Sequence, residues 1–216
     1  MSLLIIDPYR FNQSSDPCVP ITNTTTQFIS GGGTALHYVP VSYYYNWSFG
    51  CLLLRAEELG AAKQFTGLEL SENTSRRAGL SVPRQYVKMY HTTANLMESS
   101  FSYLGSFGVA STLVGANPNM PVTDETLCFT GTWVKSAGSG WKAMNFNANN
   151  FCYNGTDNVL IFWVNDWGSY DTNNYPRWNT SSVTADVSRG AYDYDDVTEP
   201  TTVRRSDVRP HLKLKY

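Results

Sequence analysis

An uninterrupted apolar run, Val159–Val164, constrains the fold of this chain more than any other part of the sequence. A run without a polar position is typical of a strand buried on both faces, since a half-exposed strand alternates between apolar and polar side chains. A turn signal precedes it, because Asn154 and Gly155 tolerate the positive φ of a tight reversal. We therefore expect strand, turn, strand here, with alternate side chains of the run facing two covered layers: Ile161 and Trp163 on one side, Phe162 and Val164 on the other.

Short β-patterns separated by turn residues continue along most of the chain. A short helical or turn insert is expected at Arg55–Gly60, where the glycine has the position of a C-cap, and one short helix at Ala94–Phe101. This spacing predicts an all-β fold, an antiparallel β-sandwich or jelly roll. The other expected strands are Trp47–Leu54, Phe65–Leu70, Tyr86–Tyr90, Ser111–Leu113, Thr126–Trp133, Lys142–Phe146, Ala191–Tyr194 and His211–Lys215.

Residues 1–44 have the pattern of an extended N-terminal arm, which leaves 45–216 for the sandwich. Four prolines and the triple glycine at residues 31–33 interrupt short apolar clusters that are too small to form a core of their own. Two interpretations follow. The segment extends along a neighbouring subunit, or it is a strand-bearing terminus that folds onto its own domain.

The composition excludes some classes of function. The 216 residues carry a formal charge of −2, whereas a nucleic-acid-binding surface needs a basic field. No apolar run approaches the ~20 residues of a membrane-spanning helix. Charged residues are only 16% and aromatic residues 14% of the chain, so Asn, Thr, Ser and Tyr must cover much of the surface. This composition is typical of virion and secreted β-proteins and of contact surfaces.

The N-terminus lacks the pattern of a secretory signal, since its apolar stretch, Leu3–Ile6, is only four residues long and no basic region comes before it. We therefore expect a protein made in the cytoplasm and released by lysis. The cysteines are Cys18, Cys51, Cys128 and Cys152, and none of them has the CxxC spacing of a zinc site. In this setting we expect four free thiols rather than two disulfides.

The histidines do not indicate catalysis. His37, His91 and His211 lie in no nucleophile motif such as GxSxG, and no two of them have the spacing of metal ligands. Structural, hydrogen-bonded roles are the better interpretation. We therefore expect a protein that is not an enzyme.

A long loop rich in Gly, Asn and aromatic residues follows the buried strand. Loops of this composition occur at protein-contact hot spots and at sugar-stacking sites, but their aromatic rings also cover hydrophobic cores. All three interpretations stay open. The candidate binding residues are Trp167, Tyr170, Tyr175 and Trp178.

Carboxylates gather near the end of the chain, at Asp193, Asp195 and Asp196. Dense oxygen ligands suit calcium, which would be the only cofactor of this protein. The competing interpretation is a solvated loop in which Arg204 and Arg205 neutralise these acids.

Several blocks of sequence resemble, in order, a β-sandwich module of surface adhesins of Bacteroidetes-type bacteria and of virion proteins of their tailed phages. The resemblance covers about residues 44–214, and it includes a final strand that contains Arg-Pro. The blocks are Tyr44–Ser48, Arg55–Gly60, Phe65–Leu68, Val87–Thr93, Ser99–Phe101, Gly140-Trp141, Phe151–Leu160 and Val208–Leu212.

The resemblance implies a non-enzymatic structural protein of a bacteriophage virion. Its arm is then expected to dock onto other virion proteins, within an assembly that holds several copies, as capsid decoration or at the tail or fibre. Head decoration is slightly favoured. Two alternatives stay open: a carbohydrate-binding module that adheres to host surface glycans, and a secreted bacterial adhesin. Neither nucleic acid nor a membrane is an expected partner.

Overall fold

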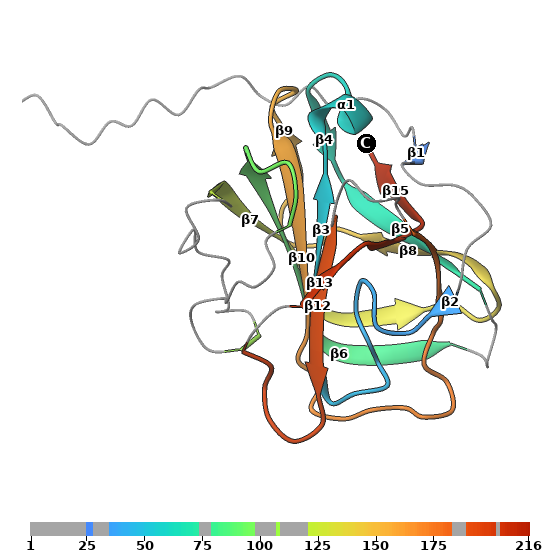
Figure 1. The fold of residues 1–216 in the computed structure, drawn as a ribbon. Helices are drawn as coiled ribbons and strands as arrows, with labels where there is room; N and C mark the ends of the chain where they lie inside the picture. Colours follow the sequence, from blue (N-terminus) through green and yellow to red (C-terminus); the bar gives the residue numbers. More distant parts are fainter. Residues whose placement is uncertain are drawn as a thin grey trace, which may run out of the picture.

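The computed structural model describes residues 25–27, 35–73, 79–97, 107–108, 121–182, 189–201 and 204–216. These residues form an antiparallel β-sandwich, as the sequence predicts (Figure 1). One sheet has six strands, in the order β13 (Arg204–Ser206), β12 (Gly190–Asp195), β3 (Trp47–Leu54), β10 (Asn158–Asn165), β6 (Leu80–Thr92) and β7 (Val122–Lys135).

The second sheet has seven strands, and a small third sheet has two. The main path of the second sheet runs β1 (Thr25–Gln27), β15 (Leu212–Lys215), β5 (Gly67–Glu72), β11 (Trp178–Ser182) and β14 (Val208–Pro210). Beside it, β2 (Ala35–Leu36) pairs with β11 and β8 (Gly140–Asn145) pairs with β5. The third sheet joins β4 (Lys63–Phe65) to β9 (Phe151–Tyr153).

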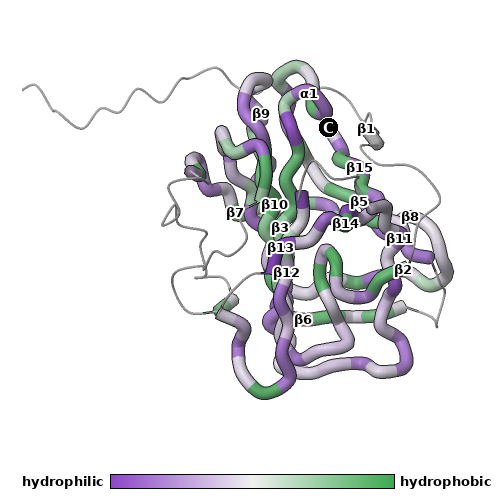
Figure 2. The backbone as a smooth tube through the Cα atoms, viewed as in Figure 1, coloured by the Kyte–Doolittle hydropathy of each residue, from purple (hydrophilic) through white to green (hydrophobic). Residues whose placement is uncertain are grey.

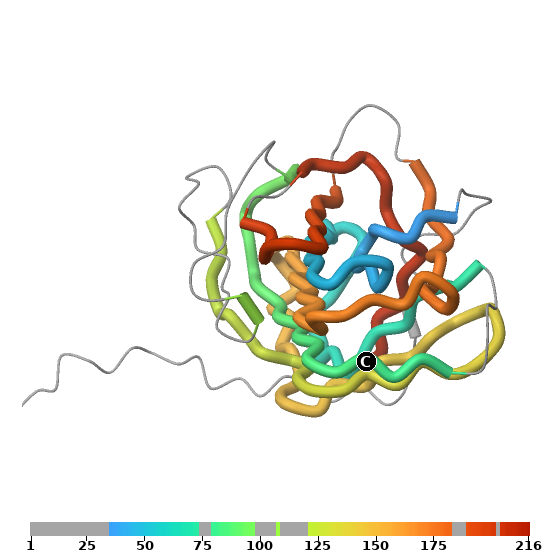
Figure 3. Tube along the Cα trace, turned by 90° about the horizontal axis from the view of Figure 1, so that it is seen from below, coloured from blue at the N-terminus to red at the C-terminus, as the bar shows by residue number. Residues whose placement is uncertain are grey.

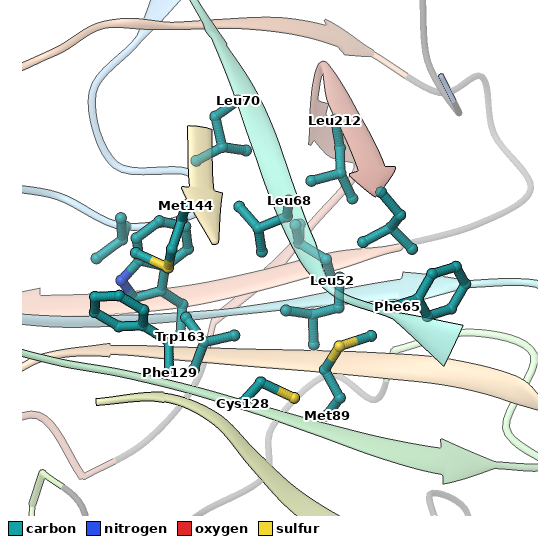
Figure 4. Close-up of a cluster of buried hydrophobic side chains, with 14 of the residues drawn as sticks. Leu52, Phe65, Leu68, Leu70, Met89, Cys128, Phe129, Met144, Trp163 and Leu212 are labelled. Atoms are coloured by element: carbon teal, nitrogen blue, oxygen red, sulfur yellow. The ribbon is translucent and has the colours of Figure 1, made fainter. Parts of the chain in front are cut away.

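Strand β10 lies in the middle of the six-stranded sheet and is buried on both faces, which confirms the interpretation of the apolar run. Ile161 and Trp163 belong to the core between the sheets, shown in Figure 4. Phe162 and Val164 belong to a second cluster on the opposite face, together with Phe49. Figure 2 shows hydrophobic residues along β3 and β10. Strand β10 therefore has no face exposed to water.

The turn before β10 forms at the predicted residues. Gly155 has φ +84°, and the side-chain oxygen of Asn154 accepts hydrogen bonds from the backbone N–H groups of Thr156 and Asp157, at 3.0 Å each. The two flanking strands do not pair with each other, however. Strand β9 pairs with β4, whereas β10 pairs with β3 and β6. The turn redirects the chain from the small sheet into the centre of the sandwich.

A short helix forms within Arg55–Gly60. The helix α1 (Ala56–Leu59) is a single turn, and Gly60 follows it with φ +72°. The helix expected at Ala94–Phe101 is absent from the part of it that the structure describes, residues 94–97. Ala94 and Met97 instead pack on the outer face of the six-stranded sheet, in the cluster that contains Phe162 and Val164. The rest of that predicted helix, and the strand expected at Ser111–Leu113, lie outside the described residues.

The domain boundary expected at residue 44 is too late. Val39, Val41 and Tyr43 are completely buried in the core between the sheets, so the last part of the expected arm belongs to the sandwich. The reason lies in Gly50 of β3, because a Cβ at this position would collide with the backbone carbonyl of Pro40. This glycine lets residues 39–43 pass directly over the strand. Residues 35–38, which include β2, are also described, and the remainder of the expected arm lies outside the described residues, except for β1.

The thiol prediction holds for two cysteines and is wrong for one. Cys51 and Cys128 are free and buried, and burial raises the pKa of both thiols. Cys152 is disulfide-bonded. Its side chain is exposed, although those of Phe151 and Tyr153 on either side are buried. The alternation of the strand therefore turns this cysteine away from the core that its apolar neighbours suggested.

The long strand β7 lies at an edge of the six-stranded sheet, and asparagine side chains occupy part of that edge. The amide of Asn147 accepts from the N–H of Thr130 at 2.9 Å and donates to the carbonyl of the same residue at 2.8 Å. Asn149 donates to the carbonyl of Leu127 at 3.0 Å. These contacts replace hydrogen bonds that a further strand would make.

Candidate binding surface

Three segments that are distant in sequence meet at one end of the sandwich, the lower end in Figure 1, which faces the viewer in Figure 3. They are residues 37–46 before β3, residues 166–177 between β10 and β11, and the end of β12 with its following loop. Asn46 connects all three. Its carbonyl accepts from the N–H of Gly168 at 2.9 Å, and its side chain donates to the carbonyl of Asp196 at 2.8 Å.

Aromatic rings from these segments form a continuous cluster around His37. The centroid of its ring lies 5.4 Å from that of Tyr38, 5.5 Å from that of Tyr44 and 5.5 Å from that of Tyr175. We call the whole cluster the tyrosine end. Its members are His37, Tyr38, Tyr44, Tyr45, Tyr175, Tyr192 and Tyr194.

Two stacked pairs set the geometry of this cluster. The rings of Tyr45 and Tyr194 lie 4.0 Å apart at an angle of 14°, and those of Tyr192 and Tyr194 lie 5.9 Å apart at 11°. Tyr192 and Tyr194 point to the same face of β12, as alternate residues of a strand do. Tyr175 is buried and forms part of the floor of the cluster, while the other six rings are half-buried.

Partial burial shifts the pKa values of several of these side chains. Burial and the neighbouring Arg177 lower the pKa of His37, so this imidazole is neutral at physiological pH. Burial, followed by the adjacent Tyr194, raises the pKa of Tyr45 to about 12. Burial also raises the pKa of Tyr38 and of Tyr192. At neutral pH the tyrosine end is therefore an uncharged surface of rings and hydroxyl groups, which suits contact with another macromolecule.

The four aromatic residues expected to bind are not grouped as a single site. Trp178 is completely buried, and its indole N–H donates to the carbonyl of Val41 at 3.1 Å. Tyr175 joins the core and the tyrosine end, and Trp167 packs against the core while half-buried. Only Tyr170 is clearly exposed, at 52%. Three of these residues, two in the loop and Trp178 in β11, thus cover the core, and Tyr170 is the exposed ring of the loop.

The acidic residues expected to bind calcium serve separate purposes. Asp193 pairs with Arg204 at 3.4 Å, as the competing interpretation predicted. The side chain of Asp195 accepts from the N–H of Val197 at 2.7 Å and so stabilises its own turn, while that of Asp196 accepts from the N–H of Asn46 at 3.1 Å. Within the described ranges, no three His, Cys, Asp or Glu side chains are placed to hold a metal ion together.

Two histidines have polar partners that the sequence did not reveal. His91 Nδ1 lies 3.2 Å from a carboxylate oxygen of Asp124, and its Nε2 accepts from the N–H of Asn154 at 3.2 Å. His211 Nε2 lies 2.9 Å from the hydroxyl of Ser181. This Ser–His pair resembles part of a hydrolase triad. In the part of the chain that the structure describes, no carboxylate hydrogen-bonds to His211, and burial lowers the pKa of its imidazole.

Most of the tyrosine end was missed because its rings come from isolated positions on three segments. The signal available in the sequence was the Tyr43-Tyr44-Tyr45 run together with Tyr192 and Tyr194 on one strand face.

Comparison of the chain with protein-family models, with curated proteins and with solved structures finds no match. Among the residues with described structure, none lies in a helix long and apolar enough to cross a bilayer.

Proposed function

We propose that this protein is a non-enzymatic structural protein of a tailed-phage virion, held in the particle by contacts between proteins. The observation that carries the proposal is the tyrosine end, where half-buried aromatic rings from three segments gather at one end of the sandwich. Tyrosine provides contact area and hydroxyl groups at a low cost in conformational entropy, which favours specific assembly. Head decoration is the preferred position in the particle, and tail or fibre attachment is the other.

Two sequence blocks that carry the resemblance to virion and adhesin modules meet in the fold, which supports the proposal. Glu58 of the Arg55–Gly60 block and Arg209 of the Val208–Leu212 block form an ion pair at 2.7 Å. The N-terminal arm remains part of the proposal as a second docking element, now limited to residues before the sandwich. Other virion proteins and further copies of this chain are the proposed partners.

The experiment uses purified particles of the phage that encodes this chain, grown with the gene deleted and with variants supplied in trans. Wild-type protein is expected to band with the particles in a density gradient and to be detected there by mass spectrometry. A Tyr45→Ala/Tyr194→Ala double variant is expected to be soluble and folded but to stay at the top of the gradient. Val134→Ser, which changes an exposed residue of β7, is the matched control and is expected to band normally.

Recovery of the wild-type protein only outside particles would contradict the proposal. Adhesion to a host glycan is the second candidate, because Tyr170 exposes its ring beside polar residues of the same loop. A glycan array distinguishes the two. Binding that is lost in Tyr170→Ala, together with absence from particles, would favour the adhesion module over the virion protein.

A further inference from the structure

A cluster of charged residues surrounds Glu58 beyond the end of β3 that is opposite the tyrosine end (Figure 1). The carboxylate of Glu58 accepts from Arg189 Nη1 and from Arg209 Nη1, at 2.7 Å each, and from the backbone N–H of Arg55 at 2.8 Å. These residues come from α1, from the residue before β12, from β14 and from the residue after β3. Three arginines from three parts of the chain therefore place positive charge around Glu58.

The charges in this cluster do not balance. Arg55 directs its guanidinium to Glu57 at 3.3 Å, but the side chain of Glu57 is 71% exposed, so water screens that pair. Arg189 and Arg209, which are only 7% and 4% exposed, share the single carboxylate of Glu58. Burial lowers the pKa of Arg189, and the neighbouring positive charges of Arg209 and Arg55 lower it further, while Glu58 raises it. The cluster holds one more buried positive charge than negative.

Donor groups are also left over. Arg189 and Arg209 each give one N–H group to Glu58, and Arg189 Nε, Arg209 Nη2 and Arg55 Nε are buried without a hydrogen-bond partner. A buried donor without a partner costs about 1–3 kcal/mol, and such groups call for a bound ion or water. A guanidinium presents its donors as a planar fork that fits two oxygens of a carboxylate or phosphate.

From these observations we infer that Arg189 and Arg209, with Arg55 beside them, form a binding site for an oxyanion. The ligand supplies the negative charge that Glu58 alone does not, and its oxygens accept from the unpartnered donors. Phosphate and carboxylate share this chemistry. The source is either a free phosphate ion or an acidic side chain of a neighbouring subunit. The inference stands on the charge cluster and is independent of the proposed function.

The test measures binding to the full chain at constant ionic strength, with chloride as the balancing anion. Inorganic phosphate is titrated in one arm, and N-acetyl-glutamate, which stands in for an acidic side chain, in the other. Isothermal titration reports affinity, and the thermal midpoint reports linkage, since a ligand that binds only the folded state raises the midpoint. Saturable binding of one anion per chain is expected. Tighter phosphate binding indicates a free ion, and tighter carboxylate binding indicates a subunit contact.

Three variants decide whether the binding belongs to this cluster. Arg209→Lys keeps the charge but removes the fork, so affinity should fall about tenfold. Arg204→Lys, whose side chain is 69% exposed and paired with Asp193, is the control and should bind as the wild type does. Glu58→Gln removes the carboxylate that competes for the donors, so the anion should bind more tightly and raise the midpoint of this variant by more. A purely structural cluster would not gain affinity in this way.

Two outcomes would overturn the inference. One is that the wild-type chain shows no saturable binding of phosphate or N-acetyl-glutamate in the chloride buffer. The other is that Arg209→Lys and Arg204→Lys lose the same amount of affinity for the anion. If Arg209→Lys does not fold, the wild-type titration and the response of Glu58→Gln decide the question by themselves.

Discussion

Gly50 lies directly beneath the backbone carbonyl of Pro40, with no room for a Cβ between them. The contact brings the segment before β3 into the core, where Val39 and Val41 are completely buried. A side chain at residue 50 would push this segment off the sheet. The position of one glycine therefore determines whether residues 39–43 belong to the sandwich or to an arm.

Gly50→Ala is expected to destabilise the protein by about 3 kcal/mol or more, at the upper end for overpacking, because the new methyl group meets backbone that cannot rotate away. Urea unfolding followed by tryptophan fluorescence measures the change. Thr132→Ala, at an exposed position of β7, is the control and should shift the free energy of unfolding by no more than about 0.5 kcal/mol. Equal stability of the two variants would show that the close contact is absent.

Deletion of residues 1–43 is expected to unfold the domain. It removes three completely buried side chains, Val39, Val41 and Tyr43, each of which contributes about 1.5–3 kcal/mol on burial. Their sum approaches the whole stability of a typical domain, which is ~5–15 kcal/mol. A deletion of residues 1–34 keeps these side chains and should remain folded by circular dichroism. A cooperative thermal transition in the longer deletion near that of the intact chain would contradict the revised boundary.

Acidic substitutions should be equally damaging on both faces of β10. Ile161→Asp and Phe162→Asp place a carboxylate in the two different apolar clusters, and either burial should remove most of the stability of the domain. The matched control is Val134→Asp, at a side chain that is 66% exposed. Soluble yield and thermal midpoint are the measurements. Tolerance of aspartate at one face but not the other would mean that the outer face is not covered.

The tyrosine end should make the protein sensitive to alkali. The pKa of Tyr45 is raised in the folded state to about 12, so its contribution to stability is fully present below the unfolded pKa of about 10 and is lost as the pH rises towards 12. Thermal midpoints at pH 9 and pH 11 should therefore differ less in Tyr45→Phe than in the wild type. Tyr170→Phe is the control. An equal loss in all three proteins would contradict the assignment.

The Ser181–His211 pair should not hydrolyse esters. A nucleophilic serine needs a base held by a third group, but His211 is buried, with a lowered pKa, and its described contacts include no carboxylate. Hydrolysis of p-nitrophenyl acetate should be the same for the wild type and Ser181→Ala. General-base catalysis accelerates a reaction about 10²-fold or more. A decrease of that size in the hydrolysis rate of Ser181→Ala would contradict this prediction and indicate that the pair is catalytic.

Local pattern predicted the strands well because the information is contained in consecutive residues. The strand expected at Trp47–Leu54 has those limits in the structure, and the double burial of β10 followed from the absence of a polar position. Which strands pair with each other was harder to predict from the sequence. The strong turn at Asn154-Gly155 joins two strands of different sheets, because strand partners are selected by tertiary packing.

The candidate sites were largely hidden in the sequence for the same reason. Glu58 and Arg209 are separated by 151 residues, and no local rule connects them. Trp178 has the flanking residues of a binding loop, yet it lies in a strand that points it into the core. The arm boundary failed because prolines and glycines suggested an extended linker, whereas Gly50 of the next strand admits that segment to the core.

The Asn147 amide at the edge of β7 has a consequence for crowded copies of this protein. An open edge lets identical chains join into a continuous sheet, and the risk rises steeply with local concentration. Here the incoming strand would first have to break the two hydrogen bonds between Asn147 and Thr130. The Asn147 amide therefore raises the cost of adding a strand of another copy at this part of the β7 edge.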